Sequence, residues 1–278
     1  MLPFTGYAMR EQNRAFADDP AWTGVEIDFQ RANYALRVDP YLHEHSLEYV
    51  SVHALELSVA SVEPPRWRYL AELAAVAEEN GAVAISDHLG LNDARRGGPA
   101  VGHVIAPPCT RAALDAVCRN VDLIQRFIGD KQFFLENLSH FFLWPGEMDE
   151  VEFVCRVLER TGCGLLLDVT NAYADELNFG FDASAFVRAT VGCASRLQMH
   201  LAGGFIDPKS GRYVDSHSEP IPEPVWNLCR EALELGRGKF DALFIERDWN
   251  FPTEDGWRDE LRQLRQVVLA MEPDTCLG

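Results

Sequence analysis

Polar side chains able to bind metal ions follow a series of short apolar segments in this sequence, each close to the point where a segment ends. They are His53, His88, Glu136, Asp168, Asn171, His200, Asp215, His217, Glu246 and Asp248. Burying so many ionisable groups at one level is costly unless they are paired or bind cations. The set exceeds the needs of one ion of ordinary coordination number, so it predicts a cluster of two or three ions.

The ligand types narrow the choice of metal. Imidazole with carboxylate suits zinc, iron or manganese better than calcium or magnesium, and no cysteine falls within the set. We expect Glu136 to bridge two ions, because it lies between the pair His53 and His88 and the later ligands. The expected catalytic residues are Glu136, Asp168, His200 and Glu246.

Each of these residues taken alone has a simpler explanation. A single histidine after an apolar run, such as His53, is more often a hydrogen-bonded core residue. A carboxylate at a strand end, such as Asp168, can cap the next helix. Asp248 is a less certain ligand, since it also fits a carboxylate that orients a ligand histidine. For the whole set the alternative is a metal-free polar network, but the neutral hydrogen-bonding residues typical of such a network are scarce here.

Alternating apolar runs and amphipathic segments predict the elements that position these residues. The expected strands are residues 2–8, 24–29, 49–54, 82–87, 132–136, 164–168, 196–201 and 242–246. The expected helices are residues 66–80, 111–128, 149–161, 182–190, 224–235 and 256–271. The near-continuous Val, Ile, Leu and Phe of the middle strands are typical of parallel strands covered on both faces. The pattern therefore predicts one (β/α)8 barrel domain over residues 1–278, with the polar set at the carboxyl ends of its strands.

Two long segments after expected strands, residues 90–110 and 203–214, would lie on the active face of such a barrel. They are expected to be lids over the site or plain surface loops.

Composition disfavours several classes of partner. The formal net charge of −18 argues against a nucleic-acid backbone or an anionic membrane as the main partner. The seven cysteines are odd in number and form no Cys-x-x-Cys pair, so we expect free, mostly buried thiols and no disulfide framework. No apolar run follows a basic segment near residue 1 and no apolar stretch reaches 18 residues, so we expect no signal peptide, no membrane span and a cytoplasmic protein.

The motifs that carry the polar set resemble those of a known family. They are SDHL at 86–89, LEN at 135–137, LLLDVTNAY at 165–173, MHLAGG at 199–204, DSH at 215–217 and IERD at 245–248. In this order, and over most of the chain from Gly6 to Asp248, they resemble the multinuclear non-haem iron-dependent oxidative enzymes, which include the methanobactin-forming oxidase.

The resemblance implies a xylose isomerase-like TIM barrel that holds two or three iron ions in mixed Fe2+ and Fe3+ states on the ten residues named above. It implies O2 as a co-substrate and a cysteine in a ribosomally made precursor peptide as the substrate. It also implies a small partner protein that recognises the peptide leader, and hence a heterodimer.

Three other functions are weighed against this one. A metal-dependent hydrolase or nuclease of the endonuclease IV type would share the fold, but that enzyme has a histidine where this chain has Asn171, and the acidic composition disfavours DNA. A sugar isomerase or epimerase with one divalent ion would not need so many ligands. A non-catalytic peptide-binding scaffold would not need the full ligand set.

Overall fold

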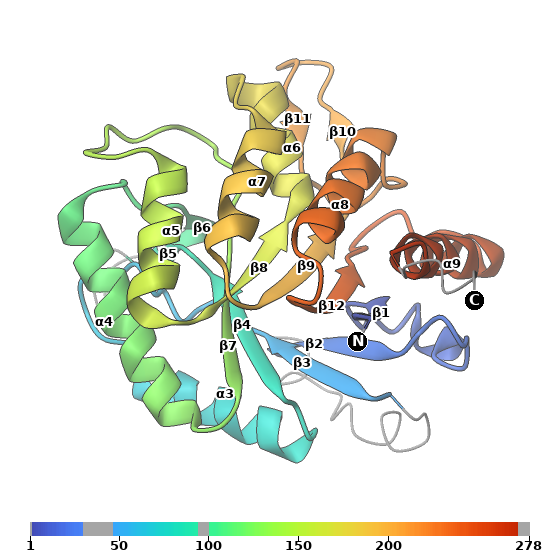
Figure 1. The fold of residues 1–278 in the computed structure, drawn as a ribbon, viewed down its shortest axis with the longest axis horizontal. Coiled ribbons are helices and arrows are strands. Elements are labelled where there is room, and N and C mark those ends of the chain that lie inside the picture. Colours follow the sequence, from blue (N-terminus) through green and yellow to red (C-terminus); the bar gives the residue numbers. More distant parts are fainter. Residues whose placement is uncertain (1, 30–46, 94–99, 272–278) are drawn as a thin grey trace, which may run out of the picture.

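Eight parallel strands form the sheet at the centre of the computed structural model, which describes residues 2–29, 47–93 and 100–271 (Figure 1). In sheet order they are β1 (Phe4–Tyr7), β12 (Phe240–Ile245), β9 (Leu197–Leu201), β8 (Gly164–Asp168), β7 (Gln132–Glu136), β4 (Ala84–His88), β3 (Tyr49–His53) and β2 (Gly24–Asp28). Every neighbouring pair in this order is parallel. The predicted (β/α)8 barrel is confirmed.

The two ends of the strand order meet at β1 and β2 and nearly close the barrel. Ala8 forms a parallel bridge with Glu26, and the Met9 amide donates to the Glu26 carbonyl at 2.8 Å. Gly6 is needed at this seam, because a Cβ there would lie 1.8 Å from the Gly24 carbonyl oxygen. The closure brings β2 and its side chains next to the strands from the second half of the chain.

Helices cover the outside of the barrel, as Figure 1 shows. They are α3 (Trp67–Glu79), α4 (Arg111–Ile128), α5 (Glu150–Thr161), α6 (Val169–Phe179), α7 (Ala183–Cys193), α8 (Glu223–Leu235) and α9 (Glu254–Leu269), with a short 3-10 helix η1 (Arg14–Phe16) after β1. Thr110, Asp149 and Asp182 cap α4, α5 and α7 by accepting a hydrogen bond from a backbone N–H of the first turn. These caps explain why the sequence pattern located the helices well.

Alternation along the strands builds the inside of the barrel. Phe134, Leu166 and Phe244 pack together as a small inner core. Glu136, Asp168 and Glu246 each follow one of these residues by two positions. Side chains at i and i+2 of a strand point to the same face of the sheet. The metal-binding set therefore lies directly above a packed apolar layer, at the carboxyl end of the barrel.

The structure adds elements that the sequence pattern did not predict. Helix α6 begins directly after Asp168, in a segment for which no helix was expected. The segment 90–110 contains a hairpin of β5 (Leu91–Asp93) and β6 (Ala100–Ile105), and its residues 94–99 lie outside the described part. The segment 203–214 contains the short hairpin β10 (Phe205–Ile206) and β11 (Tyr213–Val214). Neither segment is a plain loop.

The expectation of free thiols was wrong for one pair of cysteines. Cys155 on α5 and Cys193 at the end of α7 form a disulfide, with their Cα atoms 5.6 Å apart. The two helices lie side by side, and 38 residues separate the cysteines, so no local spacing could indicate the pair. Cys118, Cys163 and Cys229 are buried free thiols as expected.

Within the described ranges no helix has both the length and the apolar character that a membrane crossing requires.

Candidate metal centre

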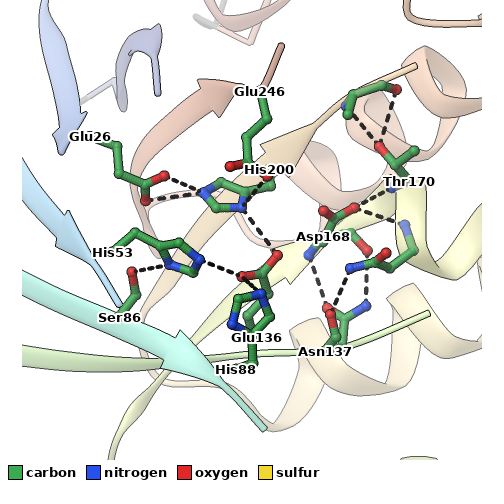
Figure 2. Close-up of polar contacts among 12 residues, drawn as sticks. Glu26, His53, Ser86, His88, Glu136, Asn137, Asp168, Thr170, His200 and Glu246 are labelled. Carbon is green, nitrogen blue, oxygen red and sulfur yellow. Dashed lines mark hydrogen bonds and ion pairs between the residues drawn. The ribbon is translucent and has the colours of Figure 1, made fainter. Parts of the chain in front are cut away.

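Two groups of potential metal ligands meet inside the mouth of the barrel, and Glu136 belongs to both. His53, His88 and Glu136 form the first group, and Glu136, Asp168, His200 and Glu246 form the second. Within each group the ligand atoms lie within 4.8 Å of one another. Figure 2 shows Glu136 between the three imidazoles.

Glu136 uses its two oxygens toward different histidines. Its Oε2 lies 3.4 Å from Nε2 of His53 and 3.4 Å from Nε2 of His88, whereas its Oε1 lies 3.1 Å from Nδ1 of His200. Strand register produces this placement, because Glu136 pairs with His88 and Asp168 pairs with His200 across adjacent strands. The arrangement fits a carboxylate that bridges two ions, one in each group.

Several buried oxygens at the site lack hydrogen-bond partners, as expected for oxygens that bind a metal ion. Glu136 Oε2, Asp168 Oδ2 and Asn171 Oδ1 are all buried and accept no hydrogen bond from the residues that the structure describes. Burial raises the pKa of Asp168 well above its usual value, and the charges of Asp215 and Glu136 raise it further. A bound cation would satisfy these oxygens and offset the negative charge.

Hydrogen bonds on the far side of two imidazoles select the nitrogen that would bind metal. His53 Nδ1 lies 2.9 Å from the Ser86 hydroxyl, which leaves Nε2 facing Glu136. His200 Nε2 lies 2.9 Å from Glu26, which leaves Nδ1 facing Glu136 and Glu246. A ligand histidine that donates its other N–H to a carboxylate or hydroxyl is held in one tautomer and one orientation.

Asp168 both caps a helix and faces the site. Its Oδ1 accepts hydrogen bonds from the backbone amides of Thr170 and Asn171, at 2.6 and 2.8 Å, and so starts α6. The Asn171 side-chain amide donates to the Asn137 carbonyl, and this leaves its oxygen free for a ligand role. The capping explanation and the metal explanation for Asp168 are therefore compatible, since each uses a different oxygen.

The remaining predicted ligands form a third set beside the second group. His217 Nε2 lies 3.2 Å from Asp215, and its Nδ1 lies 3.3 Å from Asp248 and 3.5 Å from Glu246. His217 has a φ of 51°, an uncommon conformation for a residue other than glycine and one frequent at functional sites. Asp248 also accepts a hydrogen bond from Arg10 Nε at 2.9 Å, which fits the interpretation that it orients His217.

Two residues of the site were missed by the sequence reasoning. Glu26 lies in the middle of β2 and bonds His200, and Arg10 follows β1 and contacts Asp248 and Glu246. Both are almost fully buried. For Glu26 a signal existed, because an acidic residue between Val25 and Ile27 in an apolar strand implies a partner inside the barrel.

Metal removal is expected to lower the melting temperature of the protein by about 5–10 °C at pH 8. An ion at a hundred times its Kd stabilises the native state by about 2.7 kcal/mol, and about 2–4 °C of melting temperature correspond to each kcal/mol in a chain of this size. Burial would lower the pKa of His88, but Glu136 and Asp87 raise it to about 9. Metal must displace that proton, so the stabilisation should shrink at pH 6. Differential scanning fluorimetry with and without a chelator checks both effects, and equal melting temperatures would contradict metal binding.

Comparison with known proteins shows to which family the chain belongs. The model of the family described as the RiPP precursor modification enzymes MbnB/TglH/ChrH matches residues 33–269; RiPPs are ribosomally synthesised and post-translationally modified peptides. The chain belongs to this family. The match covers every predicted ligand, and it confirms the resemblance that the motifs indicated. As a member of the MbnB/TglH/ChrH family, the chain is related to enzymes that modify precursor peptides.

Its relatives include proteins described only as UPF0276 proteins. One from Rhizorhabdus wittichii is 37% identical over 231 residues, which cover 80% of this chain and 77% of that protein. One from Anaeromyxobacter is 38% identical over 224 residues, which cover 80% and 76%.

Solved structures with a similar fold are much more distant in sequence. A D-allulose 3-epimerase from Methylomonas sp. has a TM-score of 0.61 at 13% identity and covers 96% of this chain and 98% of its own. Endonuclease IV from Thermus thermophilus has a TM-score of 0.57 at 17% identity and covers 97% and 100%. At these identities the likeness supports the xylose isomerase-like barrel and nothing about activity.

Proposed function

We propose that this protein is a multinuclear iron-dependent oxidase that uses O2 to modify a cysteine in a ribosomally made precursor peptide. The observation that carries the proposal is the shared position of Glu136 in two donor groups at the mouth of the barrel. Family membership supports a precursor peptide as the substrate. The imidazole–carboxylate donors suit iron, zinc or manganese, and the motif resemblance to the multinuclear iron enzymes favours iron among these three metals.

Neither donor group contains a cysteine of the chain itself. Iron held by these residues would supply Lewis acidity toward a substrate thiolate together with one-electron redox chemistry. O2 is the electron acceptor: a two-electron oxidation of the cysteine side chain converts O2 to one hydrogen peroxide molecule, and a four-electron oxidation converts it to two water molecules. The proposal includes iron in mixed Fe2+ and Fe3+ states. It also includes a third ion near Asp215, His217 and Asn171.

The residues of the chain have three tasks in this scheme. His53, His88, His200 and the carboxylates hold the ions in place. Glu26 and Ser86 fix the orientation of two imidazoles through hydrogen bonds on their far sides. The packed layer of Phe134, Leu166 and Phe244 below the site closes the barrel interior, so that substrate and O2 reach the ions from the carboxyl face.

The proposal includes a small partner protein that recognises the peptide leader and forms a heterodimer with this chain in the cytoplasm, where ribosomes make the peptide. The formal net charge of −18 suits a basic partner or a basic leader segment.

Co-expression with a cysteine-containing peptide and a small protein encoded beside this gene is expected to change the mass of the peptide at its cysteine. The change should require iron and O2, and His88→Ala should abolish it. The matched control is His103→Ala, because His103 is exposed and belongs to neither donor group. Mass spectrometry of the peptide gives the measurement. An unmodified peptide together with cleavage of abasic DNA would favour the nuclease instead, and full activity with one zinc ion and no iron would exclude an iron oxidase.

A further inference from the structure

A cavity of about 650 Å³ lies beside the metal centre, between the loop after β7 and helices α5, α6 and α7. Its volume is typical of sites that bind small molecules or peptide side chains. Most of the wall is apolar, with Leu138, Trp144, Met148 and Phe186 among the lining residues. The cavity is separate from both donor groups, and neither the family nor the proposed chemistry assigns it a role.

The charged groups of this cavity carry an excess of negative charge. Asp149, Glu150, Asp175, Asp182 and His140 line it, and its lining includes no lysine or arginine. Asp149 and Asp182 already accept hydrogen bonds as helix caps, and Asp175 accepts a hydrogen bond from the His140 backbone amide at 2.8 Å. Among the described residues Glu150 has only a long ion pair, with His140 Nε2 at 3.9 Å.

The geometry argues against one metal ion held by all three of His140, Glu150 and Asp175, although the three side chains converge. His140 Nδ1 lies 2.6 Å from Asp175 Oδ2, which is the distance of a hydrogen bond. Two ligands on one ion at about 2 Å from the metal would stand roughly 3 Å apart or more. His140 and Asp175 are therefore a hydrogen-bonded pair, and Glu150 remains to receive a cationic group.

The cavity and the metal centre share a wall residue. Asn137 lines the cavity, and its side chain exchanges hydrogen bonds of 2.9 Å with the backbone of Asp168. The loop after β7 exposes Leu143 and Trp144 at the cavity itself, and Phe141 and Phe142 beyond it. An occupant of the cavity would thus lie next to the metal centre and continue along an exposed apolar surface, as a peptide chain would and a small sugar would not.

We propose that this cavity binds a segment of the precursor peptide in which a lysine or arginine has apolar neighbours, with Glu150 as the counter-ion of the basic group. The identity of the peptide rests on the proposed function, whereas the preference of the cavity for an apolar cation rests on its lining alone. A largely apolar wall with an excess of carboxylates favours an ammonium or guanidinium group that brings apolar atoms with it.

A fluorescent probe tests the cavity without any peptide. Dansylcadaverine combines an aromatic ring with a primary ammonium group, and dansylamide is a neutral counterpart. At pH 8, Glu150 is ionised, although burial and the charges of Asp175 and Asp149 raise its pKa to about 7 against the effect of His140. The purified protein is expected to bind dansylcadaverine with a gain in fluorescence. Glu150→Gln should weaken that binding about tenfold and leave dansylamide binding unchanged.

Two further variants complete the test. Ala185→Phe fills the cavity from α7 and should abolish binding of both probes. Glu152→Gln, the matched control, removes a charge from the same turn of α5 but outside the cavity, where Glu152 pairs with Arg156, and should bind both probes like the parent. Circular dichroism establishes that each variant folds. Equal binding of dansylcadaverine by the parent, Glu150→Gln and Ala185→Phe would overturn the proposal.

The peptide itself gives the second measurement. Glu150→Gln should raise KM for the precursor peptide about tenfold with kcat within twofold, and dansylcadaverine should compete with the peptide. An unchanged KM in both Glu150→Gln and Ala185→Phe would overturn the assignment of the cavity to the peptide. If the probe binds as expected and no peptide is modified, the cavity stands as a site for apolar cations and only the proposed function fails.

Discussion

Replacing Glu136 by glutamine is expected to remove most of the bound metal and to lower turnover at least about a hundredfold, while the barrel still folds. Glu136 is the residue common to both donor groups, so the change weakens two sites at once. The amide is neutral and offers one oxygen, whereas the carboxylate faces His53 and His88 with one oxygen and His200 with the other. The expected loss follows from the removal of both a bridging oxygen and a negative charge.

Metal analysis of anaerobically purified protein measures this effect, and circular dichroism measures the fold. Glu260→Gln is the matched control, since Glu260 is a largely buried glutamate on α9 that pairs with Arg247 at 2.8 Å and belongs to neither donor group. This control should keep its metal content and turnover. If Glu136→Gln retains the iron content and turnover of the parent, the bridging role is wrong.

Strands and capped helices could be predicted from the sequence because local signals define them. The bounds of β7, β8 and α4 agree with the expected segments 132–136, 164–168 and 111–128. Each strand is a short apolar run, and α4 starts at a threonine cap and ends at Gly129, where φ is positive. The carboxyl ends of parallel strands meet at one face of a barrel, and this topology brought the predicted ligands together.

Helix α6 was not predicted because residues at its start face the metal centre and do not show a helical sequence pattern. The segment after Asp168 has little amphipathic pattern, since its first turn packs Val169, Thr170 and Asn171 inward together. Its cap is Asp168, a residue that the sequence reasoning assigned mainly to metal. The disulfide between Cys155 and Cys193 depends on how α5 and α7 pack, which residue spacing does not encode. Hairpin β10–β11 consists of two-residue strands, and the longer strand of hairpin β5–β6, Ala100–Ile105, has its apolar residues interrupted by Gly102 and His103.

Glu26 was not predicted for a different reason, because the predicted ligands all lie at or after strand ends. Glu26 lies in the middle of β2, yet the seam at Ala8 and Glu26 brings it level with the metal centre. Its oxygens lie 2.9 and 3.0 Å from His200 Nε2, and both side chains are fully buried. Figure 2 shows Glu26 on the side of His200 that faces away from Glu136. The contact across the seam joins segments that are far apart in the chain, so only the closed barrel reveals it.

Replacing Glu26 by alanine is therefore expected to weaken metal binding by about 10–100-fold, although Glu26 itself belongs to neither donor group. The imidazole of His200 loses the acceptor that holds Nδ1 toward Glu136 and Glu246. The same change should destabilise the metal-free protein by about 3 kcal/mol, because it leaves His200 buried without its partner. Glu26→Gln keeps an acceptor oxygen for Nε2–H and should recover much of the metal affinity. Iron titration monitored by absorbance gives the affinity, and urea unfolding gives the stability.

Gln198→Ala is the control for Glu26→Ala. It distinguishes the loss of His200 orientation from a general loss of stability in the barrel interior. Gln198 faces inward two residues before His200 and donates a hydrogen bond of 2.8 Å to the Tyr49 hydroxyl, one layer below the metal centre. Its loss should reduce stability and leave the metal affinity within about threefold of the parent. Glu26→Ala should reduce both quantities, because the residue acts on the metal through His200. If Glu26→Ala binds metal as tightly as the parent, His200 needs no hydrogen-bond partner on its far side. The assignment of Nδ1 as the ligand atom of His200 would then be wrong.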